Sequence, residues 1–94
     1  MIKKENKAPD FYLGEGAELV ARNRISGDVF CPAKMNGTKK LSDFFTDKKM
    51  SWDERDKTPI ILCGEKIVAV GDLRFSREFQ DRTKIGYKIE IKEI

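Results

Sequence analysis

The sequence predicts an α+β fold: a small, mainly antiparallel sheet or barrel of about five strands, with one longer and one short helix inserted mid-chain. Ninety-four residues are enough for one domain with a modest core, and we expect no second domain. Apolar residues make up 39% of the chain and charged residues 37%, a balance typical of a soluble, highly charged protein. Apolar residues recur with a strand period on both sides of a segment with a helix period.

The N-terminal third contains a polar start and two predicted strands. Residues 1–12 are mostly polar and carry no periodicity, which predicts a linker or a frayed N-terminus and leaves 13–94 as the domain. Strands are predicted at 17–23 and 29–31. Between them, 26–28 reads Ser-Gly-Asp, a combination that favours a turn because glycine tolerates positive φ and serine or aspartate bonds nearby backbone.

Two helices are predicted in the middle of the chain. The first is expected to begin at Thr38, whose hydroxyl can cap an unpaired amide of the first turn. Its core-facing stripe follows i, i+3, i+4, i+7 spacing and consists of Leu41, Phe44, Phe45 and Lys48. The second helix, at about 52–57, follows Ser51 and Glu54, which fit a capping box. Trp52 is expected to cover the core from its first turn.

The second half is predicted to return to strands. The runs 60–63 and 67–70 flank Gly64-Glu65 and predict a hairpin. A bent strand is expected at 73–75, and the polar segment 76–84 is expected to form a loop. The clearest period-2 pattern is at 87–91, where tyrosine and isoleucine alternate with charged residues.

Composition excludes several kinds of catalytic and metal site. The chain has no histidine, which excludes histidine-based nucleophilic triads, histidine general bases and histidine metal ligands. Cys31 and Cys63 are too few for a disulfide framework and are expected to be buried or half-buried free thiols. The sequence holds neither an apolar run of about 18 residues nor a phosphate-binding glycine loop. We expect a cytoplasmic, non-catalytic chain that does not enter a membrane.

The excess positive charge lies in one segment. Residues 1–32 and 51–94 each carry equal numbers of basic and acidic side chains, so the net charge of +3 comes entirely from 33–50. The lysines of this segment are Lys34, Lys39, Lys40, Lys48 and Lys49. Clustered lysines make an anionic partner plausible, although an ordinary solvated helix face explains them as well.

Two arginines precede this segment on a predicted strand. Arg22 and Arg24 are alternate residues and can share a face. With Lys39 and Lys40 beside a predicted helix start, they suggest one cationic platform suited to the phosphates of an A-form RNA stem. A solvated face followed by a turn is the competing interpretation, and these residues alone do not decide between them.

The same region resembles a known family. The matching runs read Arg22-Asn23-Arg24-x-x-Gly27-Asp28-x-Phe30-x-Pro32, then Met35-x-Gly37-Thr38-Lys39-Lys40-Leu41-x-Asp43-Phe44-Phe45-x-Asp47-x-Lys49, then Arg55-Asp56-x-x-Pro59. They are similar to the C-terminal domain of bacterial tRNA(Ile)-lysidine synthetase, over residues from about 19 to 75. This sequence departs from the family pattern at three positions. Lys34 stands where glycine is common, Val29 where a basic residue is common, and Ser51 where proline is usual.

The resemblance implies a role in tRNA modification. The family enzyme uses ATP, with magnesium, to join lysine to the wobble cytidine of an isoleucine tRNA. Its adenylating domain carries an SGGxDS phosphate loop, which this sequence lacks, so the chain itself is expected to have no ligase activity and no cofactor. The C-terminal domain of the family binds tRNA on the acceptor-stem side, and its fold resembles a small β-barrel-like domain of the phenylalanyl-tRNA synthetase β subunit.

The resemblance also implies which residues contact RNA and which partners are involved. The positions carried over are Arg22, Arg24, Lys39, Lys40 and Arg55. Charge clustering alone adds Lys34, Lys48 and Lys49. The expected partners are an isoleucine-specific tRNA and the catalytic domain of the parent enzyme, and a homodimer stays open. The alternative function is a protein-interaction or dimerisation module without RNA affinity of its own.

Overall fold

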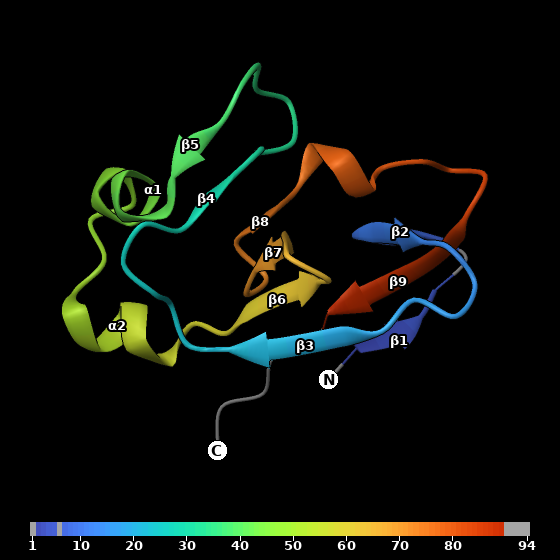
Figure 1. The fold of residues 1–94 in the computed structure, drawn as a ribbon, viewed down its shortest axis with the longest axis horizontal. Helices are drawn as coiled ribbons and strands as arrows, with labels where there is room; N and C mark the ends of the chain where they lie inside the picture. Colours follow the sequence, from blue (N-terminus) through green and yellow to red (C-terminus); the bar gives the residue numbers. More distant parts are fainter. Residues whose placement is uncertain (1, 6, 90–94) are drawn as a thin grey trace.

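Antiparallel pairing organises the chain into three small sheets (Figure 1). The computed structural model describes residues 2–5 and 7–89. Within them the strands are β1 (Ile2–Lys4), β2 (Phe11–Leu13), β3 (Leu19–Arg22), β4 (Val29–Phe30), β5 (Lys39–Lys40), β6 (Ile60–Cys63), β7 (Lys66–Val70), β8 (Arg74–Phe75) and β9 (Ile85–Ile89). The helices are α1 (Leu41–Asp47), α2 (Trp52–Lys57) and the short 3-10 helix η1 (Arg77–Phe79). The sheets have the orders β1-β9-β2, β3-β6-β7-β8 and β4-β5. The predicted α+β class is therefore confirmed, although the described residues form more strands than the five expected.

The four-stranded sheet is covered on both faces. Successive residues of a strand point to opposite faces, so Ile60 and Leu62 of β6 pack with α1 while Ile61 packs with β2 and β9. A bulge opposite Ile61/Leu62 places Val68 and Ala69 of β7 together on the second face. The core consists of two layers separated by this sheet, and α1 lies at the end of the molecule away from β9 (Figure 1).

The first helix begins two residues later than predicted, with its N-cap at Lys40. Thr38 is not its N-cap, because Lys39 and Lys40 form β5 and pair with β4. Lys40 occupies the cap position without a side-chain cap, and the Leu41 amide donates instead to the carbonyl of Asp28 at 2.9 Å. Of the predicted stripe, the three apolar members are buried, whereas Lys48 is exposed and follows the last helical residue.

The second helix has the predicted bounds and the predicted cap. The amide of Glu54 donates to the Ser51 hydroxyl at 3.2 Å, and the Ser51 amide donates to the Glu54 carboxylate at 2.9 Å. That backbone hydrogen bond from Ser51 lowers the pKa of Glu54. The expectation for Trp52 is wrong: its side chain is 68% exposed, because α2 lies at the surface and buries none of its residues.

The prediction of a linker at 1–12 is also wrong for the described residues of this segment. Ile2–Lys4 pair with β9, and Phe11 is fully buried in the core. The Glu5 amide donates to the Gly86 carbonyl at 2.9 Å. A Cβ at Gly86 would lie 2.7 Å from both the Glu5 carbonyl oxygen and the Cβ of Pro9, so glycine permits this close approach. Short polar strands that pair only with a distant strand leave no local periodic signal.

The remaining predictions agree with the structure where it describes them. The hairpin β6–β7, the strand at Arg74–Phe75 and the loop around η1 lie where they were expected. The last strand is confirmed as far as Ile89, and its predicted end at 90–91 lies outside the described residues. Cys31 and Cys63 are half-buried free thiols, as predicted.

Candidate nucleic-acid interface

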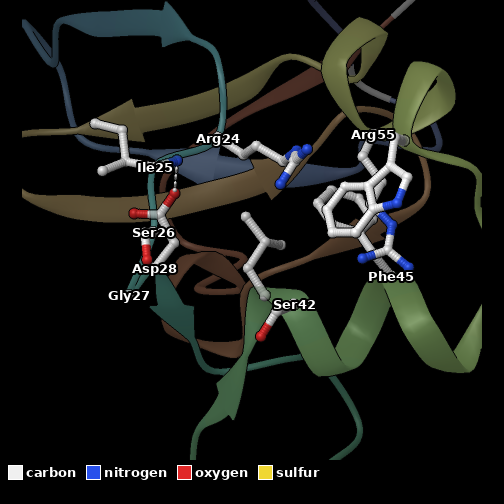
Figure 2. Close-up of a pocket in the computed structure, with 10 residues that line it drawn as sticks. Arg24, Ile25, Ser26, Gly27, Asp28, Ser42, Phe45 and Arg55 are labelled. Atoms are coloured by element: carbon white, nitrogen blue, oxygen red, sulfur yellow. Dashed lines mark hydrogen bonds between the residues drawn. The ribbon is translucent and has the colours of Figure 1, made fainter.

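A hollow of about 320 Å³ lies between the loop after β3 and the two helices. Its walls come from residues 24–28, Leu41, Ser42, Phe45, Trp52 and Arg55. Figure 2 shows Arg24 and Arg55 extending into this region from different elements. The hollow therefore combines apolar side chains, exposed backbone and two guanidinium groups from separate parts of the chain.

Asp28 fixes the loop that forms one wall. Its carboxylate accepts hydrogen bonds from both terminal nitrogens of Arg22, at 2.9 and 3.0 Å, and from the Ile25 amide at 2.9 Å (Figure 2 shows the last of these). Burial would raise the pKa of Asp28, but the Arg22 and Ile25 hydrogen bonds outweigh it, so the pKa lies below its ordinary value. The side-chain hydrogen bonding between Arg22 and Asp28 also raises the pKa of Arg22. Gly27 completes the turn at φ +91°, where glycine is favoured.

Arg24 also pairs with an aspartate, but in a more open setting. Its Nε donates to Oδ1 of Asp56 at 3.2 Å, and its Nη2 lies 3.0 Å from the same oxygen. The Asp56 side chain is 65% exposed, compared with 11% for Asp28. The guanidinium carbon of Arg24 lies 5.1 Å from the centre of the Trp52 ring, within cation–π range.

Arg55 holds α2 against the first helix. Its Nε donates to the Met50 carbonyl at 3.0 Å. Its guanidinium carbon lies 4.8 Å from the Trp52 ring centre and 5.8 Å from that of Phe45. Within the described part of the chain no carboxylate pairs with Arg55, so its charge is not neutralised locally there.

The five lysines of 33–50 have different surroundings. Lys39 pairs with Asp47. Lys40 is exposed and is the cross-strand partner of Val29, whereas Lys39 is the partner of the buried Phe30; the two lysines therefore lie on opposite faces of the β4–β5 pair. Lys34 lies in the loop between β4 and β5 at φ +68°. Lys48 and Lys49 are exposed and follow α1, and neither has an ion-pair partner among the described residues.

The predicted platform is therefore rearranged. Arg22, Arg24 and Lys39 are each paired with a carboxylate, and the expected convergence of both arginines with both lysines beside a helix start does not occur. The structure instead brings Arg24 and Arg55 together around Trp52. Sequence reasoning missed Trp52 as part of this site. The signal was its i, i+3 spacing to Arg55, which places the two side chains on one face of a helix.

The described residues contain neither a group of three or more His, Cys, Asp or Glu side chains that could hold a metal ion nor a helix long and apolar enough to cross a bilayer. The site is therefore defined by cationic, aromatic and backbone groups. The polar side chains that line the hollow are those of Arg24, Ser26, Asp28, Ser42 and Arg55.

Residues 19–91 match the family model described as "TilS substrate C-terminal domain". This chain belongs to that family. The match includes all the arginines and lysines discussed above, the hollow and both helices. The predicted family resemblance is thereby confirmed.

Three curated relatives are each named tRNA(Ile)-lysidine synthase. The protein of Caldanaerobacter subterraneus is 44% identical over 63 residues, which cover 67% of this chain and 14% of that protein. That of Bacteroides thetaiotaomicron is 37% identical and covers 95% of this chain and 25% of its own length. That of Persephonella marina is 36% identical, with 99% and 22% covered. This member of the TilS C-terminal family thus spans a quarter or less of these relatives.

A solved structure shares the fold. It is described as "Crystal structure of TILS C-terminal domain", and it superimposes with a TM-score of 0.67 over 97% of this chain and 82% of that one. The sequence identity is 24%. The arrangement of small antiparallel sheets and two helices is therefore the fold of this family.

Proposed function

We propose that this chain is the non-catalytic tRNA-binding domain of a tRNA(Ile)-lysidine synthase, and that it positions an isoleucine tRNA through contacts to the acceptor stem. The observation that carries the proposal is the hollow lined by Arg24, Trp52 and Arg55 in a chain of the TilS C-terminal family. Guanidinium groups bind phosphate oxygens in a bidentate manner. An aromatic ring beside them adds a surface on which RNA bases stack.

The surroundings of each cationic side chain decide the role that we propose for it. Arg24 and Arg55 line the hollow, and Lys40 directly precedes two of its lining residues and is exposed. Lys34, Lys48 and Lys49 extend the positive charge on either side of α1 and are proposed to act through long-range attraction. Arg22 and Lys39 remain predicted contacts, although each is held by a carboxylate in the free chain.

Chemistry is assigned to the rest of the parent enzyme. The proposal places ATP, magnesium and the ligation of lysine to the wobble cytidine in a catalytic domain outside these residues, which would be the protein partner of this chain. The proposal routes no step of the reaction through the described residues, which form no metal-ligand cluster. The expected setting is the cytoplasm, where tRNA is modified.

A tRNA titration with charge-reversed variants tests the proposal. Lys40→Glu with Lys49→Glu reverses two exposed lysines at the end of the molecule that holds the hollow. We expect isoleucine tRNA to bind the variant at least about tenfold more weakly in a filter assay. The salt dependence should also flatten, by roughly 0.7–0.9 in log–log slope for each phosphate that the variant no longer neutralises. The binding of tRNA to the wild-type chain should weaken when the salt concentration is raised. The same titration with an unrelated tRNA shows how much of the binding is specific to isoleucine tRNA.

The matched control reverses two lysines at the other end. Lys4→Glu with Lys84→Glu makes the same charge change beside the β1-β9-β2 sheet, and we expect binding within about threefold of wild type, the residual effect of net charge alone. Equal weakening by both double variants, or unchanged binding of the first, would contradict the proposed surface.

Exposed apolar residues favour the alternative of a protein-interaction or dimerisation module. Val20 on the edge strand β3 is 58% exposed, as is Ile25, and Val29 is 51% exposed. Such side chains on a sheet edge can pair with another chain. Sedimentation separates the two functions, since a salt-insensitive dimer without tRNA affinity would support the alternative.

A further inference from the structure

Trp52 is exposed although nothing in the local fold requires a tryptophan there. It is the most exposed large hydrophobic side chain of the described residues, at 68%. The helix that begins with it is capped by Ser51 and Glu54, and its Arg55 contacts the ring of Phe45 in the first helix. Across the hollow from it lies Ile25, which is 58% exposed, and exposed apolar side chains that gather at a hollow with a polar rim are typical of a binding site.

The ring is nevertheless held in place. Arg55 approaches it from the same helix at 4.8 Å, and Arg24 approaches from the loop after β3 at 5.1 Å. The two guanidinium groups come from different elements and orient the indole, which stays 68% exposed. A ring oriented before the ligand arrives loses little conformational freedom on binding.

The hollow beside the ring has the chemistry of a base site. Ile25, Leu41 and Phe45 supply apolar walls. Ser26, Gly27 and Ser42 also line it, and the Ser42 hydroxyl and the amides of residues 26 and 27 have no hydrogen-bond partner among the described residues. A nucleobase has flat apolar faces and a polar edge, which matches a wall of this composition. The volume of about 320 Å³ is at the lower end of the usual range for small-ligand sites.

A paired base cannot reach such a ring, because its faces are covered by its neighbours in the helix. We propose that Trp52 stacks on one unpaired nucleotide beside an RNA stem, and that Arg24 and Arg55 bind the phosphate next to it. This inference rests on the proposed tRNA-binding function and specifies its ligand: a duplex with a single-stranded end. The acceptor stem of a tRNA ends in such a strand.

The Arg24–Asp56 pair allows this exchange of partners. Asp56 is 65% exposed, so the pair contributes little in water and a phosphate can replace the carboxylate. Asp56 is bonded to Arg24 alone among the described residues, so its release breaks no further contact there. The ring remains oriented by Arg55 while Arg24 turns to the phosphate.

Intrinsic fluorescence tests the stacking directly, because Trp52 is the only tryptophan in the chain. The full chain is titrated with three RNA hairpins of one stem sequence: one with a blunt end, one with a four-nucleotide 3′ overhang, and one whose overhang is abasic and keeps only sugars and phosphates. We expect the overhang hairpin to bind roughly tenfold more tightly than the abasic one and to quench the tryptophan fluorescence. The abasic hairpin has the same charge, so this difference isolates the bases.

Two variants sharpen the result. Trp52→Ala should bind the overhang and abasic hairpins equally and keep its affinity for the blunt hairpin, and Trp52→Phe should retain part of the preference because a smaller ring still stacks. Circular dichroism checks that both variants fold, and the wild-type fluorescence measurement needs no variant at all. If all three hairpins bind alike without quenching, the inference is overturned and the tRNA-binding function stands. If no hairpin and no tRNA binds, both are overturned.

Discussion

This molecule has two arginine–aspartate pairs with different roles, although their arginines are only two residues apart in the sequence. Arg22 and Asp28 form two parallel hydrogen bonds, and the Asp28 side chain is 11% exposed and also accepts the Ile25 amide. Arg24 and Asp56 meet through one carboxylate oxygen, with Asp56 65% exposed. The first pair shapes a wall of the hollow, whereas the second lies beside Trp52 and is open to exchange.

The difference lies in burial and additional partners, because the chemical groups are the same. A buried, multiply bonded carboxylate cannot be released without leaving polar groups unsatisfied. An exposed pair is weakened by water and salt. Whether an arginine can exchange its carboxylate for an RNA phosphate therefore depends on which carboxylate it pairs with and on how exposed that carboxylate is.

The largest expected effect on stability comes from Asp28→Asn. The neutral amide weakens the bonds from Arg22 and leaves a partly buried guanidinium without a counter-charge, so we expect the free energy of unfolding at neutral pH to fall by about 1–3 kcal/mol. Urea denaturation followed by circular dichroism measures it. A change below about 0.5 kcal/mol would show that the pair does not hold the loop.

The same variant gives the pH dependence of this pair. The pKa of Asp28 lies below its ordinary value of 3.8, so its contribution is present above 3.8 and is lost as pH falls through the lower pKa of the folded state. The stability difference between wild type and Asp28→Asn should therefore shrink as the pH is taken below 3.8. A difference that stays constant or grows on acidification would contradict the assignment.

Asp56→Asn, the matched change in the second pair, is expected to have the smallest effect on stability. Because the pair is exposed, the free energy of unfolding should change by less than about 1 kcal/mol. The variant should bind tRNA as tightly as wild type or more tightly, since Arg24 no longer needs to leave a carboxylate. The measurements are the same denaturation series and a tRNA titration. Weaker tRNA binding in a folded variant would argue against the exchange of partners.

Local patterns in the sequence predicted most of the fold. The apolar stripe of α1, the Ser51–Glu54 capping box and the β6–β7 hairpin each depend on residues close together in the chain. The strand β1 was missed because its partner β9 lies more than eighty positions away. Thr38 was misassigned as a cap because the pairing of Lys39–Lys40 with β4 is a tertiary choice that overrides a local signal.

The site could be predicted only in part. Charge clustering and the family resemblance pointed to the region of the hollow, which Arg24 and Arg55 line; that this region binds RNA stays a prediction. The pairing of Arg22 with Asp28 and of Lys39 with Asp47 depends on which carboxylates the folded chain brings near. The exposure of Trp52 depends on where α2 lies on the surface, and no spacing in the sequence shows that.

The most direct test of the central claim compares Arg22→Gln with Arg24→Gln in tRNA binding and in unfolding. The account predicts that Arg24→Gln weakens tRNA binding several-fold and flattens the log–log salt dependence by roughly 0.7–0.9, with little change in stability. Arg22→Gln should mainly lower the free energy of unfolding, and the folded variant should lose clearly less tRNA affinity than Arg24→Gln does. A folded Arg22→Gln variant that loses as much tRNA affinity as Arg24→Gln would contradict the division of roles between the two pairs.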